Sequence, residues 1–159
     1  MLFNEIVSLG SKAKVFFDMD GTLTEFVIFP KLDPDDRLEG FYDNLRPLRQ
    51  IVEKAKVMHE NGVELHILSS CFYPNHREDK IKWLEQHLPF IKKENIHIIV
   101  YRELEFQKAD KYFLKSKILK EYMEEGKEIF LIEDDHRIIK NTRQEIPNAR
   151  VYHMTSLVD

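Results

Sequence analysis

Residues 13–23 read AKVFFDMDGTL, a short apolar run that leads into two acids separated by one residue and followed by a glycine and a threonine. A nearly continuous apolar run of this length is typical of a strand that is covered on both faces of a sheet. Three similar runs occur further along the chain, and a fourth is weaker: 63–68, 96–101, 129–132 and 149–152. The pattern predicts a parallel sheet whose first strand, 13–17, ends at Asp18.

Helical patterns separate these runs. Apolar residues recur at intervals of three and four over 45–58, 79–88 and 110–125, and each segment is followed by a glycine or a proline that ends it. The alternation predicts an α/β fold, a three-layer Rossmann-like parallel sheet with helices on both faces. Residues 22–42 contain two prolines and lack either periodicity, so we expect a lid or loop there, with a small or absent cap.

Length and composition fit one domain over residues 1–159. The chain has 159 residues, of which 43% are hydrophobic and 33% charged, with a net charge of -4. An acidic chain lacks the basic surface that binds nucleic acid without sequence preference, so we expect no nucleic-acid partner. The single Cys71 excludes an internal disulfide and a cysteine-rich zinc site, and fits a reducing compartment. Apolar runs much shorter than roughly 20 residues predict no membrane span, and we expect a cytoplasmic location.

Acidic and hydroxyl side chains follow three of the predicted strands. Asp18 and Asp20 follow the first strand, Ser69 and Ser70 the second, and residues 133–135 (EDD) the fourth. Because parallel strands bind ligands beyond their carboxyl ends, we expect these side chains to share one crevice. Clustered carboxylates would repel one another unless a cation lies among them, and Mg²⁺ prefers such oxygen ligands. The sequence therefore predicts a magnesium site.

The same groups suit phosphoryl transfer. A carboxylate can attack phosphorus and carry the phosphoryl group, while a neighbouring carboxylic acid protonates the leaving oxygen and later takes a proton from water. A hydroxyl and a lysine would hold the non-bridging oxygens, because this reaction depends mostly on positioning and charge stabilisation. The cation would also reduce the repulsion between the acids and an anionic ester.

Three segments resemble motifs of the haloacid dehalogenase superfamily. Residues 15–23 (VFFDMDGTL) resemble its first motif, 67–69 (ILS) its second and 129–134 (IFLIED) its fourth, in the same order and with similar spacing. The resemblance covers nearly the whole chain. The acid at the second position of the first motif, Asp20, points to phosphatases or phosphotransferases rather than dehalogenases.

The resemblance implies a role for each matching residue. Asp18 would be the nucleophile and Asp20 the general acid and base. The metal ligands would be the Asp18 carboxylate, the Asp20 backbone carbonyl and Asp134; the acidic pair can be read as 133–134 or 134–135, so Glu133 is also a metal candidate. The phosphate would contact Ser69, with Ser70, Gly21 and Thr22 as further phosphate-binding candidates.

The lysine of the superfamily's third motif has several candidates. Residues 115–119 (KSKIL) resemble the motif pattern of a lysine followed, after two intervening residues, by a hydrophobic residue and a leucine, which favours Lys115 as the phosphate-binding lysine. Lys108 and Lys117 are the alternatives.

A narrower resemblance is to the cytosolic 5′(3′)-deoxyribonucleotidases. Residues 18–21 followed by Phe26 are similar to that group's first motif, and 78–90 to the segment after its second. The chain departs from the group in a shorter lid interval, 22–42, and a longer segment before Glu133. Four aromatic residues could stack on a nucleobase or pack a small loop core: Phe26, Phe29, Phe41 and Tyr42.

These observations lead to one hypothesis and two alternatives. The chain would be a magnesium-dependent phosphomonoesterase acting through an aspartyl-phosphate, with a nucleoside or deoxynucleoside monophosphate as substrate. The alternatives are a phosphatase for another small or macromolecular phosphate ester, and a catalytically silent phosphate-binding module. The sequence leaves the oligomeric state open.

Overall fold

The structure, a computed structural model, describes residues 1–27, 40–104 and 108–158. Five parallel strands form one sheet in the order β3-β2-β1-β4-β5. The bounds of each strand differ from those of a predicted strand by at most three residues, and this holds for the weak last strand as well. Their bounds are β1 Ala13–Phe17, β2 Glu64–Cys71, β3 Ile96–Val100, β4 Glu128–Glu133 and β5 Arg150–His153.

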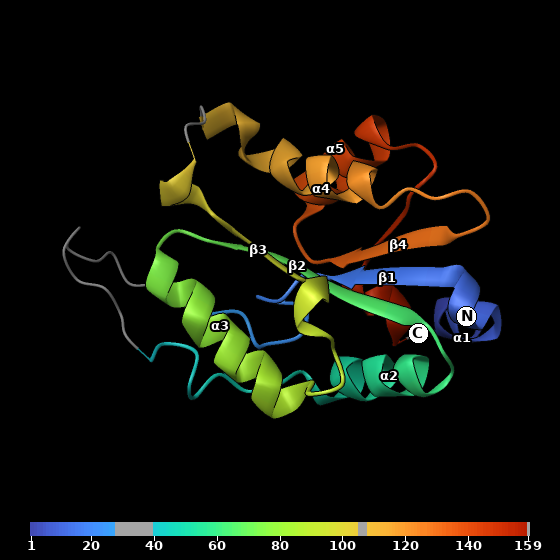
Figure 1. Cartoon of the computed structure of the whole chain (residues 1–159), viewed down its shortest axis with the longest axis horizontal. Helices are drawn as coiled ribbons and strands as arrows, with labels where there is room; N and C mark the ends of the chain where they lie inside the picture. The colour runs from blue at the N-terminus through green and yellow to red at the C-terminus, as the bar shows by residue number, and fades with distance from the viewer. Residues whose placement is uncertain (28–39, 105–107, 159) are drawn as a thin grey trace.

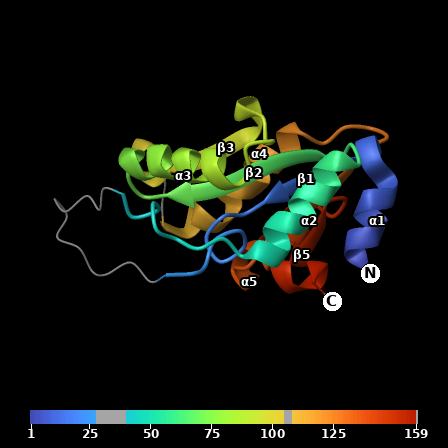
Figure 2. The same cartoon turned by 90° about the horizontal axis from the view of Figure 1, so that it is seen from below.

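Helices cover both faces of the sheet. In Figure 1, α4 and α5 lie above the sheet and α2 and α3 below it, and Figure 2 shows the same layers from below. This confirms the predicted three-layer α/β architecture. The α-helices are α1 Leu2–Leu9, α2 Arg49–Glu60, α3 Pro74–His87, α4 Leu114–Glu121 and α5 His136–Glu145, and the short 3-10 helices are η1 Gly10–Lys12, η2 Lys93–Asn95, η3 Tyr101–Glu103, η4 Lys108–Phe113 and η5 Met154–Leu157.

Strand alternation divides the core into two layers. Val15, Ile67 and Ile132 pack with the buried faces of α1, α2 and α3, whereas Phe16 and Leu131 pack with α4 and α5. Successive side chains of a strand point to opposite faces, so each strand contributes to both layers. The position of a residue in this alternation, here called its parity, therefore decides which helix layer its side chain contacts. The same rule applies to the residues at the strand ends, which form the site.

The observed helices correct several predictions. The helix predicted over 45–58 is α2, which begins four residues later, at Arg49, because Pro47 precedes it, and ends at Glu60. Helix α3 begins five residues before the predicted start at 79, with a proline in its first turn. The segment predicted as one helix over 110–125 contains part of η4 and the shorter α4.

Two helices, α1 and α5, were not predicted. The structure also extends β2 to Cys71, so Ser69 and Ser70 lie within the strand instead of following it. Most of the predicted lid, 28–39, lies outside the described residues. No helix in the described part of the chain is long and apolar enough to cross a membrane.

Candidate functional site

Acidic residues from two adjacent strands meet at the carboxyl edge of the sheet. The amide of Asp18 donates to the carbonyl of Ile132, 2.9 Å away, which joins the end of β1 to β4. One carboxylate oxygen from each of Asp18, Glu133 and Asp134 lies within 4.8 Å of the other two. The structure thus brings together the first and fourth predicted motifs, and this cluster could hold a hard cation because its donors are carboxylate oxygens.

Lys115 reaches this cluster from the first turn of α4. Its ammonium donates to Oδ1 of Asp18 and to Oε2 of Glu133, each at 2.6 Å, and its side chain is buried. Asp18 and Glu133 share the strand parity of the α4 layer, which explains why they meet a lysine of that helix. Among the other lysines considered, Lys117 is exposed on α4, and the side chain of Lys108 lies outside the described residues.

A second buried lysine, Lys80 of α3, was missed by the sequence analysis. Its ammonium forms an ion pair with Asp20 and donates to Oγ of Ser69 and to the carbonyl of Ser70, both at 2.8 Å. Ser69 has the parity of the α3 layer, opposite to that of Asp18. A signal was present in the sequence, because Lys80 stands three and four residues before Trp83 and Leu84, on the buried stripe of the helix.

The two lysines divide the site between the layers. Lys115 holds the nucleophile candidate Asp18 from the α4 layer, and Lys80 holds Asp20 from the α3 layer. Both ammonium groups are almost fully removed from solvent, at 4% and 0% exposure. A buried ammonium is costly unless it is paired and fully hydrogen-bonded. The carboxylates and the lysines therefore depend on each other for their burial.

Glu133 and Asp134 have different surroundings. Oε2 of Glu133 accepts from Lys115, and Oε1 accepts from the backbone amides of Asp134 and Asp135, both at 3.1 Å. Both oxygens of Glu133 are thus engaged by the protein. Asp134 is half-buried and its carboxylate lies over Gly21. This arrangement favours Asp134 over Glu133 as a ligand for a cation.

Gly21 permits the close approach of the two motifs. Its φ is +79°, in the left-handed region, and a Cβ placed there would lie 2.8 Å from Cγ of Asp134. The amides of Gly21 and Thr22 donate to the carbonyls of Thr24 and Met19. The Thr22 hydroxyl is buried and lies 3.4 Å from Oδ2 of Asp18. The first motif is therefore a tight turn that places the side chain of Thr22 against Asp18.

Burial dominates the electrostatics of the acidic cluster. Burial, reinforced by the nearby Glu133 carboxylate, raises the pKa of Asp18 to about 7. Burial and the Asp18 charge raise the pKa of Asp134 to about 6, and burial also raises the pKa of Glu133. Burial disfavours the charge of Lys115, but Asp18 and Glu133 outweigh it and raise the lysine's pKa. Without a metal ion, ionisation of all three carboxyl groups therefore costs free energy, even beside Lys115.

Two hydroxyls lie near the site, and the structure also places three of the four aromatic residues considered for stacking on a nucleobase. The Ser70 hydroxyl accepts from the Tyr101 hydroxyl at 2.8 Å, on the α4 side of the strand. Tyr42 is buried, with 1% of its surface exposed, so it packs in the core and is not available to a nucleobase. Phe26 is 67% exposed and Phe41 packs against the core. Phe29 lies outside the described residues.

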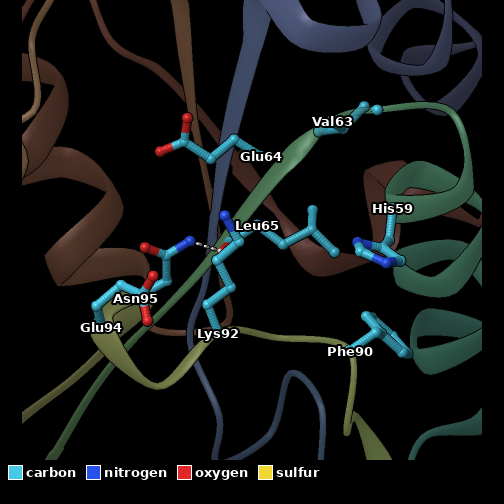
Figure 3. Close-up of a pocket in the computed structure, with 9 residues that line it drawn as sticks. His59, Val63, Glu64, Leu65, Phe90, Lys92, Glu94 and Asn95 are labelled. Atoms are coloured by element: carbon cyan, nitrogen blue, oxygen red, sulfur yellow. Dashed lines mark hydrogen bonds between the residues drawn. The ribbon is translucent and has the colours of Figure 1, made fainter.

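A separate pocket lies at the opposite edge of the sheet. It has a volume of about 420 Å³, and its walls include the start of β2 and the segment after α3. Figure 3 shows His59 beside Phe90, whose rings stack at 5.1 Å, and Asn95, which donates to the carbonyl of Leu65. The acidic cluster lies at the carboxyl ends of the strands, so this pocket does not belong to the site.

Comparison with known families gives one match. The family described as "5′ nucleotidase, deoxy (Pyrimidine), cytosolic type C protein" matches residues 37–151, well over half of the chain. The matched segment contains Ser69, both buried lysines and Asp134, and Asp18 and Asp20 precede it. No curated protein matches the chain.

Proposed function

Because the chain belongs to the family of cytosolic type C 5′-nucleotidases, which are phosphatases, we propose that it removes phosphate from nucleoside or deoxynucleoside monophosphates with the help of Mg²⁺. One observation carries the proposal for the site. Asp18 is buried against Lys115 beside two further carboxylates, at an edge where Asp20 and Ser69 are also fixed. That combination supports assigning a nucleophile, an acid and phosphate-binding groups to this one site.

In the first step, a carboxylate oxygen of Asp18 forms a bond to phosphorus. The bond between phosphorus and the ester oxygen breaks, and the leaving oxygen takes its proton from the Asp20 carboxylic acid. Lys115 keeps Asp18 oriented through its bond to Oδ1, and Oδ2, 3.4 Å from the Thr22 hydroxyl, is the less tightly held oxygen. We assign the attack to Oδ2 for this reason. The product of this step is an acyl phosphate on Asp18.

In the second step, water attacks the phosphorus of the acyl phosphate. Asp20 accepts the proton of the water, the bond from phosphorus to Asp18 breaks, and inorganic phosphate leaves. Both carboxyl groups are then restored to their starting states. The Ser69 hydroxyl, fixed by Lys80 at 2.8 Å, is a phosphate ligand in this proposal, and Ser70 lies beside it.

The residues present fit Mg²⁺. Carboxylate oxygens and a backbone carbonyl are the ligands that this ion takes in phosphate sites, and we assign them to Asp18, Asp134 and the carbonyl of Asp20. Bound there, the ion would supply charge neutralisation for the acids and for the phosphoryl oxygens. Glu133, engaged on both oxygens, is instead assigned to holding Lys115 and the turn at 134–135.

A substrate panel tests the proposed function. The purified chain with Mg²⁺ is expected to hydrolyse a generic aryl phosphate and to release phosphate from nucleoside and deoxynucleoside monophosphates faster than from sugar phosphates. Turnover without any preference for nucleotides would contradict the nucleotide part of the proposal. No turnover with any of these substrates would instead indicate a phosphate-binding module without activity.

Mg²⁺ is expected to stabilise the chain more at pH 8 than at pH 5. The folded pKa of Asp18, about 7, lies above its ordinary 3.8, so the folded state holds the proton more tightly. The stability that Asp18 contributes without metal is therefore fully present below its ordinary pKa and is lost as the pH rises through about 7. Mg²⁺ binds the ionised form and offsets this loss. At about 100 times its Kd it should raise the melting temperature by roughly 5–10 °C at pH 8.

Calorimetry or thermal fluorescence with Mg²⁺ or a chelator measures this effect. Asp134→Asn is the matched control, since it removes one assigned ligand and is expected to lose most of the shift. An equal shift in Asp134→Asn, or a larger shift at pH 5 than at pH 8, would contradict the assigned metal site.

A further inference from the structure

The ammonium of Lys80 has three hydrogen-bond partners and no exposure to solvent. Asp20, the Ser69 hydroxyl and the Ser70 carbonyl take its three donors. Asp20 and Ser69 are the acid and the phosphate ligand of the proposed reaction. The direction in which the Lys80 ammonium points therefore fixes two groups that must meet the substrate.

The ring of Tyr42 covers this ammonium. Lys80 Nζ lies 5.2 Å from the centre of the ring, within the range in which the negative face of an aromatic ring attracts a cation. The attraction is strongest where water is excluded, and both side chains are buried. Burial, the nearby Asp20 charge and a hydrogen bond between the Tyr42 hydroxyl and Asp20 raise the pKa of Tyr42, so its hydroxyl stays neutral. The ring thus lies beside an ammonium whose three N–H donors are all engaged by hydrogen bonds.

Helix α3 holds the segment that carries Tyr42 at two further points. The amide of Gly40 donates to Oδ2 of Asp79 at 3.0 Å, and the indole N–H of Trp83 donates to the carbonyl of Leu45 at 2.9 Å. Residue 83 lies on the same face of the helix as residues 79 and 80, because it follows them by four and three residues. The ring and the lysine it covers are therefore held in register by the same helix turn.

We propose that Tyr42 is a positioning residue for the reaction, whose ring keeps the Lys80 ammonium directed at Asp20 and Ser69. The inference rests on the proposed function. Without the ring, space opens beside the ammonium, and water or other lysine rotamers can compete for its donors. Asp20 and Ser69 then lose their fixed placement, which lowers kcat, while groups on the α4 side, Asp18 and Lys115, remain as they are.

Two substitutions at position 42 separate the ring from its hydroxyl. Tyr42→Phe keeps the aromatic face, and Tyr42→Met keeps an apolar side chain without it. Because the ion pair with Lys80 still holds Asp20 when the Tyr42 hydroxyl is lost, we expect Tyr42→Phe to hydrolyse an aryl phosphate with kcat within about twofold of the unaltered chain. Tyr42→Met should lower kcat on the order of tenfold with KM changed less than about twofold. Phe130→Leu, a buried aromatic in β4, is the control for loss of packing and should keep its kcat.

A second variant approaches the same point without altering the ring. Asp79→Ala removes the acceptor of the Gly40 amide, and a smaller decrease in kcat is expected because the segment loses one anchor. If Tyr42→Met does not fold, Asp79→Ala alone tests whether Tyr42 is a positioning residue. Unchanged kcat in Tyr42→Met, or in Asp79→Ala where only that variant folds, would overturn the inference. So would an equal loss in Tyr42→Phe and Tyr42→Met, which would assign the effect to the hydroxyl. No turnover by the unaltered chain would instead refute the proposed function, and the inference with it.

Discussion

Asp18→Asn is expected to lower phosphate release from an aryl phosphate by at least about 1000-fold in the presence of Mg²⁺. The amide keeps the size of the side chain but is a poor nucleophile and a weaker cation ligand. Asp20, Ser69 and Lys80 are unchanged, so binding of the phosphate should persist. A discontinuous phosphate assay under single-turnover conditions measures the residual rate free from product release.

The control for Asp18→Asn is the stability of the metal-free chain at pH 8. The carboxyl group of Asp18 has a raised pKa of about 7 because it is buried, so its ionisation destabilises the folded state at this pH. A neutral amide avoids that cost, and Lys115 still has Glu133 as a partner. The variant should therefore melt at the same temperature or higher. A folded variant that keeps more than about a tenth of the activity would show that another group is the nucleophile.

Lys115→Met is expected to have the largest effect on stability. It leaves Asp18 and Glu133 buried without their shared cation, and removing one partner of a buried ion pair typically costs about 3–5 kcal/mol. The cost should be greatest at pH 8 and decrease towards pH 5, because the two carboxyl groups can then take up protons. Urea unfolding at both pH values measures the free energy of unfolding.

Lys117→Met is the matched control for Lys115→Met. It lies on the same helix two residues away, but its side chain is exposed, so its effect should stay within about 0.5 kcal/mol. Activity should follow the same order, since Lys115 orients Asp18 and Lys117 contacts none of the acids in the described hydrogen-bond network. Equal losses in the two variants would contradict the role assigned to Lys115.

The strands and the meeting of the first and fourth motifs could be predicted from the sequence. A strand buried on both faces leaves a continuous apolar run, and parallel strands bring their carboxyl ends to one edge whatever the helices do. The meeting of Asp18 and Asp134 could therefore be predicted without knowing how the helices pack. Lys115 could be selected from a motif pattern, and its contact with Asp18 is what the structure adds.

The sequence analysis did not identify Lys80, α1 or α5, and for Lys80 and α5 the reasons are physical. A lysine on a helix is exposed in most proteins, and only packing against Ser69 and Asp20 makes burial of this one tolerable. Helix α5 begins directly after the acidic motif, with Asp135 as its N-cap. It was not predicted because residues 133–135 were interpreted as metal ligands and not as the start of a helix. The roles of Glu133 and Asp134 separate only when both oxygens of Glu133 are seen to be engaged.

The two lysines that approach from opposite layers also set the electrical balance of the site. Fully ionised, Asp18, Asp20, Glu133 and Asp134 carry four negative charges, and Lys80 and Lys115 return two positive ones. The remainder equals the charge of a single divalent ion. With one such ion the six side chains would reach electroneutrality. The proton that Asp20 carries before the proposed first step would add one positive charge, so a phosphate dianion entering from water would meet no net repulsion. Loss of either lysine would leave the site with one more net negative charge, and loss of the ion would leave it with two more.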